Sequence, residues 1–263
     1  MATTYLDAIL TAHRARVAAD DRPFERLVDE ARRCPPARGF AAALANGFAV
    51  IAEVKRRSPS KGAIDADLDP AALAAAYARG GAACVSVLTD VEYFGGSPAD
   101  LVAARDAVNV PILRKDFTVS LADVCDARIM GADAVLLIAA ALDDAELDDL
   151  HVLAVELGLD VLVEVHDEKE LERAMHVEAT LVGVNQRDLV TFAVDTDRAV
   201  RMAPQMPAGV IRVAESGITG ADDAVRLVAA GYHAVLVGES LVRSADPAAA
   251  VAALRAVGRK ADR

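Results

Sequence analysis

Eight short apolar runs, rich in β-branched residues, recur along the chain and are separated by segments that contain polar residues and glycine. They cover residues 48–54, 84–88, 111–115, 134–138, 161–165, 181–185, 211–215 and 234–238. The runs are apolar almost throughout, which is typical of strands buried on both faces of a parallel sheet. Parallel strands need long crossover connections, usually helices, so this repeat limits the folds available to the chain.

The segments between the runs have the apolar spacing of amphipathic helices, and many end in glycine, which helix C-caps favour. The clearest are residues 69–82, 97–108, 120–132, 143–158 and 221–232. Eight alternating strand and helix units predict the α/β class and a closed (β/α)8, or TIM, barrel. The length of 263 residues fits one such barrel, so we expect a single barrel domain over residues 1–263.

Residues 1–45 precede the first run and are expected to form an N-terminal helical extension. Residues 3–19 place apolar side chains on one helical face, and residues 23–33 begin with a proline, which is favoured in the first turn of a helix. A barrel does not require these helices. Two hypotheses stay open: the helices cover apolar surface of the barrel, or they help to close the mouth of an active site.

The composition argues against several classes of protein. A formal net charge of −12, with 4% aromatic residues and no tryptophan, disfavours binding of nucleic acid. No apolar stretch reaches the ~20 residues that a membrane-spanning helix needs. The N-terminus also lacks the apolar stretch of a signal peptide. We expect a cytoplasmic protein without membrane contact that is monomeric, with weak self-association as the alternative.

Neither the three cysteines nor the five histidines show the spacing of metal ligands. Cys84 lies within an apolar run and is interpreted as a buried small side chain. His166 follows Glu164 by two residues and is expected in a surface loop, with an approach to the barrel mouth as the alternative. No G-x-G-x-x-G turn follows a predicted strand, which argues against a dinucleotide. We therefore predict neither a metal nor an organic cofactor.

Charged and amide side chains stand at the carboxyl ends of several predicted strands, where barrels of this class carry their active sites. They are Glu53, Lys55, Lys115, Glu164, Asn185 and Glu215. Residues two apart share a face of a strand, so Glu53 and Lys55 are both expected to point into the mouth. Two lysines among three glutamates can neutralise one another and can separate the pKa values of an acid and a base. Salt bridges without a catalytic role are the alternative.

Small residues follow the last two predicted strands. Ser216 and Gly217 come after the seventh run, and Gly238 and Glu239 come at the end of the eighth. In this fold, the loops at these two positions often bind phosphate through backbone N–H groups. Glycine lets the backbone approach such a ligand closely. Tight turns between strand and helix are the alternative.

Two aromatic residues, Phe94 and Phe117, follow the second and third runs. Packing in the core is the default interpretation for both. A flat apolar substrate would need such side chains as walls of its pocket.

Residues 50–62, VIAEVKRRSPSKG, concentrate positive charge within an acidic chain. We interpret Arg56, Arg57 and Lys61 as a field that steers an anionic substrate toward the barrel mouth. Ser58, in the loop after the first run, is expected to contact an anionic group.

Taken together, these motifs resemble those of the indole-3-glycerol phosphate synthase family of tryptophan biosynthesis. The matching segments follow one another along the whole chain: AEVKRRSPSKG (52–62), VSVLTDVEYFGGS (85–97), PILRKDF (111–117), GADAVLLI (131–138), LVEVHD (162–167), GVNQRDL (183–189), AESGI (214–218) and VGESL (237–241). KRRSPSKG and RKDF are the most specific of them, and the N-terminal extension is also a family trait. Gln186 departs from the asparagine that relatives often have.

The resemblance implies a carboxy-lyase that converts 1-(2-carboxyphenylamino)-1-deoxyribulose 5-phosphate to indole-3-glycerol phosphate. Ring closure, loss of carbon dioxide and loss of water follow one another. By this resemblance Lys115 is the general acid at the ketone oxygen, and Glu164 is the general base of the dehydration. Lys55 and Glu53 act as partners in the later step and in orienting Lys115. The sequence leaves open which lysine serves the dehydration.

The same resemblance implies that Asn185 and Glu215 orient the substrate or the catalytic groups, and that the substrate carboxylate lies near Ser58 and Asn185. The residues implied for the phosphate are Arg187, Ser216, Gly217, Gly238 and Glu239, with Lys55 nearby. Those implied for the anthranilate ring are Phe94, Phe117 and Leu136. The implied partner is thus a small phosphorylated molecule, and the resemblance implies no metal or cofactor.

Two rival functions are weighed. One is a related sugar-phosphate isomerase, whose chemistry typically uses a cysteine and aspartate pair; no cysteine falls at the end of the first run. The other is a barrel that binds phosphate without catalysis. Retention of Lys115, Glu164, Lys55 and Glu53 argues against such a loss of activity.

Overall fold

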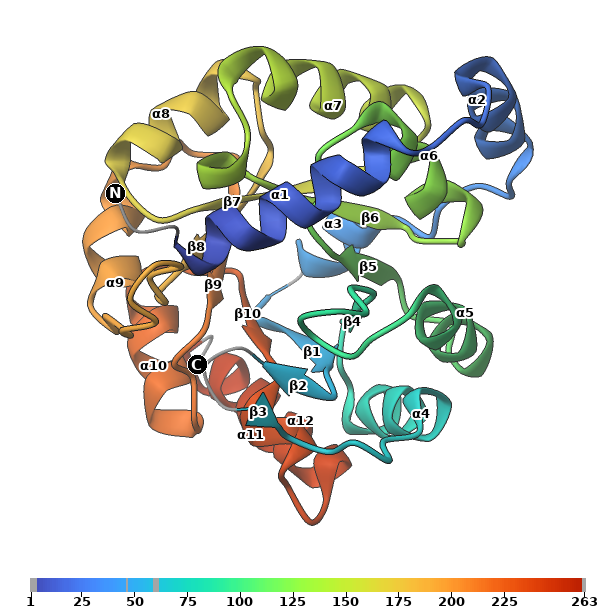
Figure 1. Cartoon of the computed structure of the whole chain (residues 1–263). Coiled ribbons are helices and arrows are strands. Elements are labelled where there is room, and N and C mark those ends of the chain that lie inside the picture. The colour runs from blue at the N-terminus through green and yellow to red at the C-terminus, as the bar shows by residue number, and fades with distance from the viewer. Residues whose placement is uncertain (1–3, 46, 59–61, 262–263) are drawn as a thin grey trace.

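The computed structural model describes residues 4–45, 47–58 and 62–261. Within them, eight parallel strands close into a barrel in the order β1-β10-β9-β8-β7-β6-β5-β4 (Figure 1). The strands are β1 (Ala49–Val54), β4 (Cys84–Leu88), β5 (Ile112–Lys115), β6 (Ala134–Ile138), β7 (Asp160–Val165), β8 (Leu181–Asn185), β9 (Ile211–Glu215) and β10 (Ala234–Val237). Each coincides within a residue with one apolar run, and the predicted (β/α)8 barrel is confirmed.

Helices surround the barrel as an outer layer (Figure 1). They are α4 (Pro70–Gly80), α5 (Pro98–Ala107), α6 (Leu121–Ile129), α7 (Asp144–Glu156), α8 (Glu168–His176), α9 (Arg198–Met202), α10 (Ala221–Ala229), α11 (Glu239–Val242) and α12 (Pro247–Ala261). Ser97, Ser120 and Asp143 each cap the start of a predicted helix by accepting a backbone hydrogen bond. Gly81 caps the C-terminal end of α4, and its φ of 89° is left-handed. No helix in the described ranges is long and apolar enough to cross a membrane.

The strand register brings the polar strand ends to one edge of the barrel. Asn185 of β8 lies beside Glu215 of β9, and Lys115 of β5 lies beside Leu88 of β4. The strand residues on both faces are largely buried, because side chains fill the inside of the barrel and helices cover its outside. A short antiparallel hairpin, β2 (Arg57–Ser58) and β3 (Gly62–Ala63), follows β1 at this edge and was not predicted.

The N-terminal extension reaches both ends of the barrel. Its first helix, α1 (Tyr5–Ala18), crosses in front of the strands in Figure 1 and contacts the loops that follow them. Tyr93, in the loop after β4, donates a hydrogen bond to Ala8 O at 3.3 Å, and Arg14 donates to Ala141 O beyond β6 at 3.4 Å. α1 therefore lies on the side of the mouth.

The remaining helices of the extension lie elsewhere. α2 (Phe24–Arg33) packs against α6 on the flank. α3 (Phe40–Leu44) lies at the amino ends of the strands, where the Ala41 backbone donates to Asp160 Oδ2 at 2.9 Å, and both Phe40 and Leu44 are fully buried. The two hypotheses for the extension thus describe different parts of it: α3 covers apolar surface, and α1 borders the mouth.

Candidate active site

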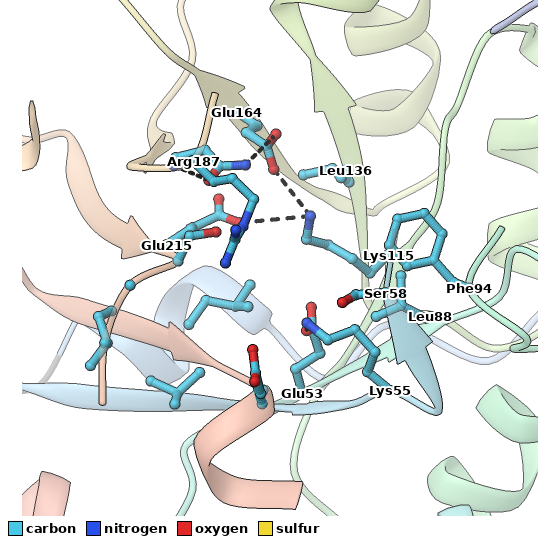
Figure 2. A pocket seen from close by; sticks show the side chains of 18 of the residues that line it. Glu53, Lys55, Ser58, Leu88, Phe94, Lys115, Leu136, Glu164, Arg187 and Glu215 are labelled. Atoms are coloured by element: carbon cyan, nitrogen blue, oxygen red, sulfur yellow. Dashed lines mark hydrogen bonds and ion pairs between the residues drawn. The ribbon is translucent and has the colours of Figure 1, made fainter. Parts of the chain in front are cut away.

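A cavity of about 450 Å³ opens at the carboxyl ends of the strands. Every residue that the sequence motifs single out for catalysis or binding lines it. They are Glu53, Lys55, Ser58, Phe94, Lys115, Phe117, Leu136, Glu164, Asn185, Arg187, Glu215, Ser216, Gly217, Gly238 and Glu239. Figure 2 shows side chains from several strands pointing into this space. The structure brings these residues together, and their individual roles stay predictions.

Lys115, the last residue of β5, lies at the centre of the charged group. Its Nζ is 3.0 Å from Glu164 Oε2 and 3.7 Å from Glu215 Oε2 (Figure 2). Asn185 donates from Nδ2 to the other carboxylate oxygen of Glu164 at 3.0 Å. Both glutamates are buried, so water and salt screen these charges only weakly.

The three charged groups shift one another's pKa values. Burial lowers the pKa of Lys115, but Glu164, Glu215 and Glu53 outweigh it, and the net shift is upward. Burial raises the pKa of Glu164, but Lys115 and His166 outweigh it, and the net shift is downward. The pKa of Glu215 is raised by burial and by the charge of Glu164. A lysine with a raised pKa, a glutamate with a lowered pKa and a glutamate with a raised pKa thus lie together, which offers both an acid and a base.

Two glycines make room for the carboxylates. A Cβ at Gly183 in β8 would clash with Glu215 Oε1, and a Cβ at Gly238 after β10 would clash with Glu53 Oε1. The same Cβ at Gly238 would lie 3.1 Å from Lys55 Nζ. Any larger residue would therefore move a charged group of the site, because packed interiors leave no spare volume.

Glu53 and Lys55 form an ion pair within the cavity, as Figure 2 shows. Glu53 is in β1 and Lys55 directly follows the last residue of that strand. Because the two residues are two positions apart, both side chains project from the same face. The Lys55 side chain keeps 18% of its surface exposed, compared with 5% for Glu53. Lys55 is therefore the more accessible of the two to an anionic ligand.

The loops after β8 and β9 meet at one side of the cavity. Ser216 and Gly217 have φ angles of 65° and 72°, so the chain turns sharply after β9 in a conformation that is uncommon for serine. Gln186 donates from Nε2 to Ser216 O at 2.7 Å, and the Arg187 backbone donates to Asn185 Oδ1 at 3.0 Å. These bonds hold the loops after β8 and β9 beside Asn185, which is itself bonded to Glu164.

An apolar wall forms another side of the cavity. The ring centroids of Phe94 and Phe117 are 6.2 Å apart, and Leu136 lies almost fully buried on β6. Figure 2 shows Phe94 and Leu136 near Lys115. A flat ring held against this wall would lie beside the ammonium.

His166 was expected in a surface loop, and the structure corrects this. Its side chain is 12% exposed, with Nδ1 2.9 Å from Glu170 Oε2 and Nε2 3.5 Å from Glu164 Oε1. Burial lowers its pKa, but the hydrogen bond to Glu170 and the charge of Glu164 outweigh this and raise it. The sequence carried one signal for this contact, because residues two apart on an extended chain share a side.

Sequence spacing also missed a cluster that forms through space. His13, Asp90 and Asp116 are buried, and one potential ligand atom of each lies within 4.8 Å of the others. Among the described residues this is the group whose atoms could hold a metal ion. The carboxylates already have partners, since Asp90 accepts backbone hydrogen bonds and Asp116 pairs with Arg114 at 3.1 Å.

The proposed steering field needs a correction at Arg56. Its guanidinium pairs with Asp100 at 3.0 Å and donates to the backbone of Ala66 at 3.1 Å, so its charge is compensated within the fold. Lys61 lies outside the described residues.

Arg243, which directly follows α11, also lines the cavity. It was not singled out from the sequence because it lies two residues beyond the recognised VGESL motif.

Comparison with known proteins agrees with the geometry. The profile of the family described as indole-3-glycerol phosphate synthase matches residues 6–254. A protein of that name from Nocardioides sp. is 59% identical over 207 residues, which cover 79% of this chain and 80% of that protein. Another from Mycolicibacterium vanbaalenii is 49% identical over 258 residues and covers 97% of this chain and 95% of its own length.

Solved structures add a more distant likeness. Thiamine phosphate pyrophosphorylase from Pyrococcus furiosus matches with a TM-score of 0.62 at 14% identity, covering 83% of this chain and 98% of that one. At this identity the likeness concerns the barrel fold alone.

Proposed function

The chain belongs to the indole-3-glycerol phosphate synthase family, and on this premise we propose how its cavity carries out the family reaction. The substrate, 1-(2-carboxyphenylamino)-1-deoxyribulose 5-phosphate, has a phosphate, an aromatic carboxylate and a ketone. The reaction forms a carbon–carbon bond between the aromatic ring and the ketone carbon, then releases carbon dioxide and water.

The cavity offers a separate surface to each part of this substrate. The phosphate binds the loops after β9 and β10 through Ser216, Gly217 and Gly238, with Arg187 as a cation at the same end. Glu239 takes part through its backbone N–H, with Lys55 nearby. These residues line one cavity, and the backbone turn at Ser216 and Gly217 supports this placement.

The other end of the substrate faces the apolar wall. Phe94, Phe117 and Leu136 flank the anthranilate ring, and Ser58 and Asn185 hold the carboxylate. Phe94 and Phe117 stand close enough to form one continuous surface, with ring centroids 6.2 Å apart. Placing the ring here and the phosphate at the far loops stretches the substrate across the cavity and brings its ketone toward Lys115.

Lys115 acts as the general acid in ring closure. When the ring carbon that bears the carboxylate attacks the ketone carbon, the ketone oxygen gains negative charge, and the Lys115 ammonium donates a proton to it. The upward pKa shift of Lys115 keeps this group protonated when it meets the substrate. Carbon dioxide then leaves from the same ring carbon, and the ring recovers its aromatic electron system.

Glu164 acts as the general base of the dehydration. It takes a proton from the carbon next to the nitrogen, while the hydroxyl formed in the first step leaves with a proton from an acid. The lowered pKa of Glu164 keeps its carboxylate ionised for this step. Lys55, paired with Glu53, is placed to hold the substrate or to act as that acid, and Asn185 and Glu215 orient the groups around Lys115.

One observation carries this proposal: the Lys115 ammonium, 15% exposed, lies between Glu164 and Glu215 in a cavity that opens at the barrel mouth. The direct test incubates the purified chain with the carboxyphenylamino substrate and follows the fluorescence of the indole product. Product formation is expected. A folded protein that binds the substrate but forms no product would favour the non-catalytic rival, and turnover of phosphoribosylanthranilate instead would favour the isomerase.

Two further expectations belong to this proposal. A cytoplasmic location fits an enzyme of amino-acid biosynthesis whose substrate is phosphorylated. We also expect a monomeric state, with weak self-association as the alternative. Size-exclusion chromatography with light scattering would test the second.

A further inference from the structure

His13, on the buried face of α1, connects the N-terminal helix to the active-site loops. Its side chain is 4% exposed, and Nε2 lies 2.9 Å from Asp90 Oδ2. An ionised carboxylate accepts hydrogen bonds but cannot donate one, so His13 bonds to Asp90 as the tautomer that carries a proton on Nε2. Asp116 Oδ1 lies 3.8 Å from the same nitrogen. One imidazole thus faces a carboxylate from each of two loops.

The first of these carboxylates is bonded to the loop that carries Phe94. Asp90 Oδ1 accepts the backbone N–H groups of Tyr93 at 2.6 Å and Phe94 at 3.0 Å, while its Oδ2 accepts from His13. The two oxygens of one buried carboxylate therefore join the helix to the backbone of an active-site aromatic residue. The guanidinium of Arg16, an exposed residue that is also on α1, lies 3.8 Å from Asp90 Oδ2.

The second carboxylate, which faces His13 at 3.8 Å without a hydrogen bond to it, is bonded to the backbone of Phe117. Asp116 Oδ1 accepts the Phe117 backbone N–H at 2.9 Å, and its Oδ2 pairs with Arg114. The His13 ring also contacts Phe117 directly, with ring centroids 5.5 Å apart. His13 thus meets both aromatic residues of the apolar wall, one through Asp90 and the other through Asp116 and by direct packing.

We propose that His13 is a positioning residue for the reaction, which fixes Phe94 and Phe117 in the place where they hold the substrate's ring. The N-terminal helix therefore shapes the substrate site, and its role goes beyond covering the barrel. This inference rests on the proposed function, because that function assigns the ring to these two side chains. It predicts that loss of the His13 hydrogen bond weakens substrate binding more than it slows the chemical step.

A pair of variants separates the hydrogen bond from the size of the side chain. In His13→Gln, the amide nitrogen takes the place of Nε2 and can still donate to Asp90. In His13→Asn, the amide nitrogen takes the place of Nδ1 and does not reach Asp90. Ile9→Ala serves as the matched control, since Ile9 is a buried apolar residue one turn earlier on the same helix. It loosens the packing of α1 without removing a polar contact.

The measurements are kcat, KM for the carboxyphenylamino substrate, and Tm. We expect His13→Asn to raise KM about tenfold or more, the effect of losing one buried hydrogen bond to a charged group, with a smaller change in kcat. His13→Gln should recover most of the loss in KM. Ile9→Ala should lower Tm with little change in KM. If His13→Asn changes only Tm, or if Ile9→Ala raises KM as much as His13→Asn does, the inference is overturned.

Two controls separate this inference from other accounts. If the wild-type chain forms no indole product, the proposed function fails. If the chain is active and His13→Asn keeps the wild-type KM, only the role of His13 fails.

The second control asks whether His13, Asp90 and Asp116 hold a metal ion, and it uses dialysis against a chelator and addition of Zn²⁺. Wild-type KM should not respond to either. A response that His13→Asn lacks would make the cluster a metal site and contradict the proposed hydrogen-bond role.

Discussion

The Lys115 ammonium lies 3.0 Å from a carboxylate oxygen of Glu164, although β6 separates the two strands that carry these residues. The contact crosses the inside of the barrel, where both side chains are largely withdrawn from water. Each group holds the other in its charged form, so the pKa of Lys115 is raised and that of Glu164 is lowered. An acid and a base are thereby maintained side by side before any substrate arrives.

Replacing Glu164 by glutamine should remove the base while keeping a side chain of nearly the same shape. We expect kcat to fall by about 10²- to 10⁴-fold, the usual contribution of general base catalysis, with a smaller change in KM. Steady-state kinetics at several substrate concentrations measures both. A rise in KM at unchanged kcat would assign Glu164 to binding instead.

His166 should tune the pH at which Glu164 becomes active. In His166→Asn the amide replaces Nδ1, which contacts Glu170, but the ring nitrogen beside Glu164 is lost. His166 helps to lower the pKa of Glu164, so its removal should raise that pKa. Because Glu164 acts in its ionised form, the acid limb of the kcat profile should move to higher pH. An unchanged limb would show that the two groups are not coupled in catalysis.

Gly183→Ala should impair catalysis through Glu215. The added Cβ would occupy the place of Glu215 Oε1, so the carboxylate must leave the position that it holds beside Lys115. Misplacement of a catalytic group by about 1 Å can lower kcat by about 10²-fold, and we expect a loss of this order with the barrel intact by circular dichroism. Gly220→Ala is the control, because a Cβ there meets open space. Equal activity of both variants would refute this spatial requirement.

Glu215 should make the stability of the protein depend on pH in a defined direction. Its pKa is raised in the folded chain by burial and by Glu164, above the value of about 4.3 in the unfolded chain. Its contribution to the free energy of unfolding is therefore fully present below about pH 4.3 and is lost as pH rises through the raised value. Glu215→Gln cannot ionise, so its free energy of unfolding should fall less over this interval. Urea unfolding of both proteins across pH measures the difference, and parallel curves would contradict the assignment.

Much of the scaffold could be predicted from the sequence because its signals are local. Continuous apolar runs marked the strands, and the two-residue spacing of Glu53 and Lys55 placed both on one face. The parallel order of the strands then gathers their carboxyl ends at one edge, so a common pocket followed from the fold. Elements such as α9, α11 and the β2–β3 hairpin are too short to show a period and were missed.

Contacts between distant residues account for what the sequence did not indicate. His13 and Asp90 are 77 positions apart, and nothing in their spacing predicts a hydrogen bond. The space that Gly183 leaves for Glu215 depends on the register between β8 and β9, which a single sequence does not specify. Arg56 was misassigned because a basic run does not reveal which of its members meets a carboxylate such as Asp100.

The central claim is that Lys115 donates the proton that allows ring closure, and Lys115→Met tests it most directly. Methionine keeps a long flexible side chain but cannot donate a proton. Formation of indole-3-glycerol phosphate from the carboxyphenylamino substrate is measured under single-turnover conditions, with circular dichroism to confirm the fold. The account predicts that the wild-type chain forms product and that Lys115→Met slows ring closure by about 10²-fold or more. A folded Lys115→Met protein that closes the ring at close to the wild-type rate would contradict it.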